Sequence, residues 1–101
     1  MKYNVVYSQE ADKDWHELFE IIAYDYNAPS TAFKYVQELI ETIEQLQNIA
    51  ESFPLQTYRS FLKYGQCVRR INYKQMAIIY TVHGDIVYIH RIVPASMITD
   101  L

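Results

Sequence analysis

The side chains best suited to chemistry lie in the last third of the chain. Arg69 and Arg70 are adjacent, and His90 follows in a later segment. A guanidinium group binds a phosphate through paired hydrogen bonds, and an imidazole accepts or releases a proton near neutral pH. Such groups could hold a phosphate and supply an acid or a base. Arg70, Arg69 and His90 are therefore the candidate catalytic residues.

A second group of residues combines cations with an aromatic ring. Arg59, Lys63 and Tyr64 precede the paired arginines in the sequence, and Arg91 follows them. Cations interleaved with aromatic rings bind acidic protein segments or stack on the bases of RNA. The candidate residues for binding a partner protein or RNA are Arg59, Lys63, Tyr64, Arg70 and Arg91. A solvated loop is the alternative interpretation of the first three.

Metal and cofactor chemistry is not expected. The histidines His16, His83 and His90 show no ligand spacing. Cys67 is the only cysteine, so it can form no internal disulfide, and it has no obvious base within reach in the sequence. Two glycines in the whole chain leave no glycine-rich phosphate loop. We expect no metal and no cofactor, and the single cysteine agrees with a reducing compartment.

The charges are divided unevenly along the chain. Residues 1–58 contain three basic and ten acidic residues, a balance of −7, whereas residues 59–101 contain six basic and two acidic residues, a balance of +4. If the two parts form different faces, the second part presents a cationic surface that suits an acidic peptide or a phosphate backbone. The alternative is that the acids solvate helices and the bases decorate strands without forming one surface.

Length and composition limit the class of protein. The chain has 101 residues, of which half are hydrophobic and 21% are charged, and this fits a single folded domain over residues 1–101. The longest apolar run, residues 76–80, is much too short to cross a membrane. Charges recur through residues 1–30, so a signal peptide is not expected. We therefore expect a cytoplasmic protein with no membrane partner.

The N-terminal half predicts one strand and two helices. Tyr3–Tyr7 is short, aromatic and β-branched, which is typical of a strand, and Ser8 can cap the helix that follows. Apolar residues at helical spacing predict that this helix covers Gln9 to about Tyr26. A second helix is expected over about Pro29–Ala50, since proline is a favoured first residue. The predicted core positions of the second helix are Ala32, Val36, Leu39, Ile43, Leu46 and Ala50.

The C-terminal half predicts three strands. Phe53-Pro54 ends the second helix, and residues 55–65 are interpreted as a polar and aromatic linker. Strands are expected over about Gln66–Asn72, Gln75–Val82 and Ile86–Val93, and a short glycine-containing turn joins the last two. The order β-α-α-β-β-β predicts an α+β fold of two layers. In this fold an antiparallel helical hairpin packs on one face of a twisted, mainly antiparallel four-stranded sheet.

Alternation along the first of these strands places its two arginines on opposite faces. We expect Arg69 to face the helices and Arg70 to face outward, although the two faces could be reversed. A buried and unpaired guanidinium is very costly. Arg69 is therefore expected to pair with a carboxylate such as that of Glu17 or Glu20.

The same alternation assigns faces on the last strand. Arg91 is expected to share a face with Val87, Ile89 and Val93. His90 is expected to share the other face with Ile86, Tyr88 and Ile92. A histidine that is merely satisfied at the surface or at a strand edge is the alternative interpretation of His90.

Several sequence strings, in this order, resemble one protein family. Tyr3–Glu10 leads into the first helix with Ala11 and Trp15, Ser30-Thr31-Ala32-Phe33 opens the second helix, and Ile49–Pro54 closes it. The most specific strings are Val68-Arg69-Arg70-Ile71 and the block Ile78–Val87. Together they resemble the RelE/ParE superfamily of type II toxin–antitoxin toxins over essentially the whole chain. The resemblance implies a growth-inhibiting toxin that a cognate antitoxin protein neutralises.

The resemblance also implies one of two activities. RelE-type members are ribosome-dependent mRNA endonucleases with basic residues at three positions, of which Arg70 matches the first, whereas Ala77 and Ala95-Ser96 stand at the others. ParE-type members inhibit DNA gyrase and often carry an arginine followed by two aliphatic residues on the last strand. Arg91-Ile92-Val93 matches that pattern, although Pro94 stands where a histidine can follow. These positions favour a mechanism other than RelE-type RNA cleavage.

The implied partners are therefore an antitoxin and either DNA gyrase or the ribosome with its mRNA. Only the RelE-type activity would make the chain an enzyme, a metal-independent endoribonuclease. A third possibility is a chain that has lost toxicity and acts as an antitoxin-bound corepressor.

Overall fold

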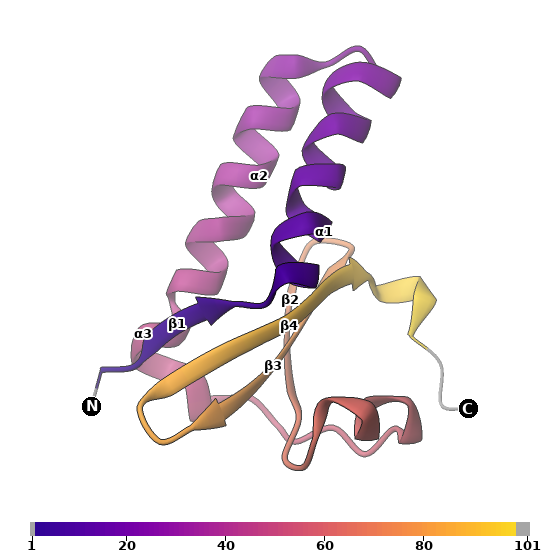
Figure 1. The fold of residues 1–101 in the computed structure, drawn as a ribbon. Coiled ribbons are helices and arrows are strands. Elements are labelled where there is room, and N and C mark those ends of the chain that lie inside the picture. Colours follow the sequence, from indigo (N-terminus) through magenta and orange to yellow (C-terminus); the bar gives the residue numbers. More distant parts are fainter. Residues whose placement is uncertain (1, 99–101) are drawn as a thin grey trace.

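The computed structural model describes residues 2–98 and arranges them in two layers. A hairpin of two long helices lies on one face of a four-stranded sheet, and the far end of the hairpin extends beyond the sheet (Figure 1). The predicted α+β class and the order β-α-α-β-β-β are confirmed. None of the helices within the described residues has the length and apolar character needed to span a membrane.

The helical layer begins at Ser8, the predicted cap. Strand β1 (Asn4–Tyr7) leads into Ser8, whose side-chain oxygen accepts a hydrogen bond from the backbone N–H of Ala11 at 2.9 Å. Helix α1 (Gln9–Glu20) follows and continues as the π-helical turn η1 (Ile21–Asp25). The end of the predicted helix therefore winds with the wider hydrogen-bond spacing of a π-helix rather than as an α-helix.

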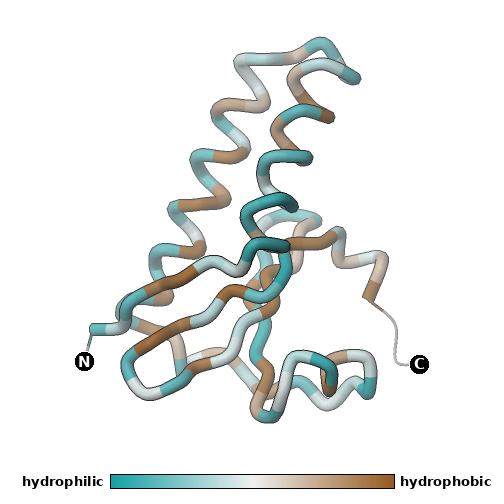
Figure 2. The backbone as a smooth tube through the Cα atoms, viewed as in Figure 1, coloured by the Kyte–Doolittle hydropathy of each residue, from teal (hydrophilic) through white to brown (hydrophobic). Residues whose placement is uncertain are grey.

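The second predicted helix divides into three pieces. These are α2 (Pro29–Glu44), α3 (Leu46–Ile49) and the 3₁₀ turn η2 (Ala50–Ser52). Pro29 is the first residue of α2, as expected from its fixed φ and missing N–H. Brown hydrophobic stretches recur along α2 (Figure 2). All six predicted core positions are buried, namely Ala32, Val36, Leu39, Ile43, Leu46 and Ala50.

Three C-terminal strands complete the sheet. They are β2 (Arg69–Tyr73), β3 (Met76–His83) and β4 (Ile86–Pro94). The strand order is β1-β4-β3-β2, with β1 parallel to β4 and the other neighbours antiparallel. β2 begins later than predicted because Cys67 has a φ of 57°, which is incompatible with a strand.

The main core lies between the hairpin and the sheet. Leu39, Ile43 and Leu46 belong to the same buried cluster as Ile78 and Tyr80. Full burial of one such aliphatic side chain contributes about 1.5–3 kcal/mol to folding. The Tyr80 hydroxyl donates a hydrogen bond of 2.6 Å to a backbone carbonyl at the end of the helical layer, so the buried ring is also satisfied as a donor.

The opposite face of the sheet, which we call the outer face, is partly covered by a short helix. The sequence predicts a linker over residues 55–65, but Arg59–Tyr64 form the 3₁₀ helix η3. Phe61 of η3 is 3% exposed and packs with Val68 and Ile79 in a second buried cluster. A third 3₁₀ turn, η4 (Ala95–Met97), follows β4. The linker interpretation is wrong because Phe61 anchors this segment on the sheet.

A β-bulge on β4 overturns the predicted alternation of that strand. Ile79 lies opposite Arg91, but its neighbour Tyr80 lies opposite Ile89, so His90 is the extra residue. Ile92 therefore joins Val87 and Ile89 in the main core. The sequence predicts that Arg91 shares a face with Val87, Ile89 and Val93. Instead Arg91 lies on the outer face with Ile79, and of those three residues Val93 alone packs on that face.

Candidate functional site

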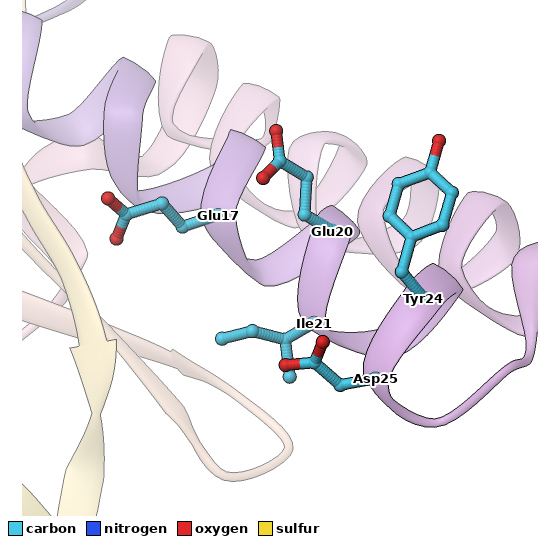
Figure 3. A pocket seen from close by; sticks show the side chains of 5 residues that line it. All are labelled: Glu17, Glu20, Ile21, Tyr24 and Asp25. Atoms are coloured by element: carbon cyan, nitrogen blue, oxygen red, sulfur yellow. The ribbon is translucent and has the colours of Figure 1, made fainter.

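Arg69 is bound at the end of the helical layer. Its Nη1 donates hydrogen bonds to the backbone carbonyl of Glu51 at 3.2 Å and to that of Phe53. Carbonyls at the end of a helical segment carry partial negative charge, so a guanidinium is favourable there. The expected partners Glu17 and Glu20 are not used. They lie exposed on α1 and line an open pocket of about 460 Å³ at its junction with η1 (Figure 3).

Arg70 and Arg91 lie in one row across the outer face. Arg70 pairs with Ile79 in the β2–β3 register, and Ile79 pairs with Arg91 in the β3–β4 register. Residues opposite each other share a face, so the two arginines flank Ile79 at a backbone separation of about 10 Å. Arg70 Nε donates to the Asn72 side-chain oxygen at 2.8 Å. The structure therefore separates the adjacent arginines Arg69 and Arg70 onto different faces.

Arg91 is held by an aspartate from the first helix. Its Nε and Nη2 donate to the two carboxylate oxygens of Asp14 at 2.7 and 3.0 Å. Asp14 also accepts the backbone N–H of Ile92 at 2.9 Å. This hydrogen bonding with Asp14 raises the pKa of Arg91 above its usual value. Arg91 is thus charged, but Asp14 offsets much of that charge.

His90 belongs to a hydrogen-bonded chain of three side chains. The Thr81 hydroxyl oxygen lies 2.8 Å from His90 Nε2 and 2.7 Å from His83 Nε2. Thr81 is 1% exposed. Burial lowers the pKa of His90, the nearby His83 lowers it further, and Glu10 opposes both effects. The neutral imidazole is therefore favoured at neutral pH.

Two tyrosine rings contact the half-buried His90, and one of them belongs to η3. The rings of Tyr64 and Tyr88 lie 5.2 and 4.8 Å from the His90 ring, centroid to centroid. The ammonium of Lys63 lies 5.2 Å from the centroid of the Tyr64 ring. Lys63, Tyr64 and Arg91 also line one pocket of about 270 Å³ between η3 and η4. The structure thus brings three of the five candidate binding residues together.

The three candidate catalytic residues bind three different groups. Arg69 binds helix-end carbonyls, Arg70 binds Asn72, and His90 binds Thr81. Arg59 begins η3, and Arg70 borders a separate hollow of about 490 Å³ at the edge of β2. Within the described residues, no group of three or more potential ligands could hold a metal ion.

Comparisons with known proteins show the family of this chain. The model of the ParE toxin of type II toxin–antitoxin systems, parDE, matches residues 5–99. The chain belongs to the ParE toxin family. Its fold also matches a chain of the solved structure described as "Chromosomal ParDE TA system from P. aeruginosa", with a TM-score of 0.73 and 20% sequence identity, over 92% of this chain and 96% of the other. A search of the curated proteins found no match.

The ParE-family chain also has an apolar hollow between the two helices of the hairpin. We call it the hairpin groove. It has a volume of about 370 Å³ and lies between α1 and α2. Phe33 on its border is 67% exposed. Its apolar lining is rimmed by the carboxylates of Glu41 and Glu44, and the complete lining is Trp15, Phe19, Phe33, Val36, Gln37, Ile40, Glu41 and Glu44.

Sequence reasoning missed two residues that organise the outer face of this ParE-family chain. Asp14 is one of ten acids in the first part of the sequence, and nothing in its spacing connects it with Arg91. Thr81 lies in a predicted strand and in the block Ile78–Val87, but the sequence assigns it no role of its own. Its alternation with His83 could have indicated a shared face, but the contact with His90 depends on a bulge that no residue pattern announced.

Proposed function

We propose that this ParE-family chain is the toxin of a type II toxin–antitoxin module and that it inhibits growth until a cognate antitoxin binds it. Membership of the ParE family supports a toxin role. The proposed targets of ParE-type and RelE-type toxins lie in the cytoplasm, so the chain is proposed to act there.

We further propose inhibition of DNA gyrase as the mechanism. This choice rests on the groups that bind the cationic side chains of this chain. A metal-independent nuclease needs several cations directed at one phosphate, whereas Arg69 binds helix-end carbonyls and Arg91 is paired with Asp14. Ala77, which stands at a position that is basic in RelE-type nucleases, is fully buried. These features disfavour RNA cleavage.

Ribosome-dependent mRNA cleavage is the second candidate function. It is favoured by the row that contains Arg70 and Arg91 and by the neutral His90 beside that row. A neutral imidazole can accept a proton from an attacking hydroxyl. The gyrase mechanism is preferred because Arg91 keeps Asp14 as a close counter-ion.

Antitoxin binding is proposed at two surfaces of opposite charge. The outer face offers Arg70, Arg91, Lys63 and Arg59 to acidic side chains. The hairpin groove offers an apolar surface with an acidic rim, which suits an amphipathic helix whose flanking residues are basic. An antitoxin that contacts both surfaces would need an acidic part and a basic amphipathic part.

Controlled induction in a bacterial host tests the proposed activity. We expect growth arrest with double-strand DNA breaks, and we expect coexpression of the cognate antitoxin to restore growth. Primer extension on mRNA from the same cultures provides the comparison. Codon-phased cuts without DNA breaks would assign the RelE-type activity instead, and unaffected growth would assign the corepressor role.

A further inference from the structure

The pocket between η3 and η4 has an apolar floor and a cationic rim. Phe61 of η3, Ile79 of β3 and Val93 of β4 form its floor, and Ile98 borders it from the C-terminal side. Lys63 and Arg91 stand at its rim. An apolar floor with a few charged groups is the usual composition of a site that holds one anchoring side chain.

Ser60 gives the pocket an unused hydrogen-bonding group. The hydroxyl oxygen of Ser60 is buried and has no hydrogen-bond partner in the described part of the chain. Ser60 also lines the pocket. A buried hydroxyl without a partner is unfavourable, and a native structure retains one where a ligand or water completes it. A bound group that carries an acceptor oxygen would satisfy this donor.

The charge of the rim is positive but small. Asp14 occupies Nε and Nη2 of Arg91 and leaves Nη1 without a bond to that carboxylate. Lys63 contributes an exposed ammonium that lies over the Tyr64 ring. One lysine and one partly neutralised arginine suit a single carboxylate. A nucleic acid backbone would require a row of unpaired cations.

We propose that this pocket receives an aliphatic side chain and the carboxylate next to it from an acidic protein segment. The aliphatic group packs on Phe61, Ile79 and Val93, and the carboxylate binds Lys63 and Nη1 of Arg91. The Ser60 hydroxyl donates to an oxygen of the same segment. This inference rests on the proposed function, because it assigns the segment to the cognate antitoxin and makes the pocket its anchoring point.

Two variants of the intact chain test the anchor against the antitoxin that restores growth when it is coexpressed with this chain. Lys63→Glu should weaken antitoxin affinity about tenfold or more, because it places like charges together. Lys13→Glu is the matched control, since Lys13 is exposed on α1 and forms an exposed ion pair with Glu17 at 3.8 Å. Ser60→Ala should weaken binding by about threefold to tenfold, the size of one lost hydrogen bond. It should also leave the free chain equally stable or more stable.

A small probe tests the pocket independently of the antitoxin. The capped dipeptide acetyl-Leu-Glu-amide should shift the NMR signals of the methyl groups of Ile79, Val93 and Ile98, whereas acetyl-Leu-Lys-amide should not. Equal antitoxin affinity for the Lys63→Glu and Lys13→Glu variants would overturn the anchor alone. Dipeptide binding by a chain that binds no antitoxin would support the chemistry of the pocket but overturn the proposed function. The anchor would also be overturned if Lys63→Glu weakened binding to nucleic acid but left antitoxin affinity unchanged.

Discussion

Asp14 and Arg91 form a two-point ion pair that joins the first helix to the last strand. The two contacts measure 2.7 and 3.0 Å, and the Asp14 side chain is 11% exposed. The same carboxylate accepts the backbone N–H of Ile92, at a point on β4 beyond the end of its pairing with β1. Asp14 thus accepts a hydrogen bond from a backbone N–H of β4 that lies beyond the end of β1. It also sets the orientation of Arg91 on the outer face.

Asp14→Asn should lower the free energy of unfolding by about 1–3 kcal/mol, because it removes the charge of a hydrogen-bonded acceptor that is mostly buried. The partial exposure of Arg91 limits the electrostatic part of this loss. Urea denaturation of both proteins measures the change. Asp25→Asn, in an exposed position on η1, is the control and should change stability by less than about 0.5 kcal/mol. Equal stability of the two variants would contradict the structural role of the ion pair.

Arg69 and Arg70 should respond differently to the same substitution. Arg69→Gln removes hydrogen bonds to the carbonyls of Glu51 and Phe53, so we expect a loss of about 1–3 kcal/mol in unfolding free energy. Arg70→Gln removes only the contact with Asn72 near the edge of β2, and its effect should stay within about 0.5 kcal/mol. Thermal and urea unfolding compare the two variants directly. A larger loss for Arg70→Gln would show that their structural roles are reversed.

Thr81 should stabilise the fold through the hydrogen bonds of its hydroxyl and not through the volume that its side chain fills. The single hydroxyl proton of Thr81 can serve at most one imidazole acceptor, so at least one of the two histidines donates its Nε2–H to Thr81 Oγ1. Thr81→Val retains the volume but breaks both contacts, and should cost about 1–2 kcal/mol. Thr81→Ser keeps the hydroxyl and should retain the signals of His83 and His90 in imidazole NMR spectra. Unchanged imidazole signals in Thr81→Val would contradict the hydrogen-bonded chain.

The lowered pKa of His90 predicts a loss of stability in mild acid. Its folded-state pKa lies below the ordinary value of 6.5, so the unfolded chain binds more protons at this position once the pH falls through 6.5. The unfolding free energy should therefore decrease as the pH falls from about 7 to about 5. His90→Gln should flatten this dependence, whereas His16→Gln, at an exposed position of α1, should keep it. The same pH dependence in both variants would contradict the burial of a neutral His90.

The regular elements could be predicted from the sequence because each follows from a repeating pattern. Leu39, Ile43 and Leu46 recur at helical spacing and are buried as expected. The proline at the start of α2 and the cap at Ser8 also act locally, so neighbouring residues suffice to recognise them.

The arrangement of the candidate site could not be predicted, because it depends on local irregularities and on contacts between distant residues. The bulge at His90 reverses the alternation of β4, and the positive φ of Cys67 delays the start of β2. Arg69 was expected to need a carboxylate, but backbone carbonyls from a distant helix end serve as its acceptors. Periodicity gives the face of a residue only while the strand remains regular.

The most direct measurement of the central claim is DNA supercoiling by purified gyrase in the presence of the purified chain. The account predicts that the chain inhibits supercoiling and causes linear DNA to accumulate, and that addition of the cognate antitoxin before the chain prevents both effects. Undiminished supercoiling at every toxin concentration, together with codon-phased cleavage of mRNA on purified ribosomes, would contradict it.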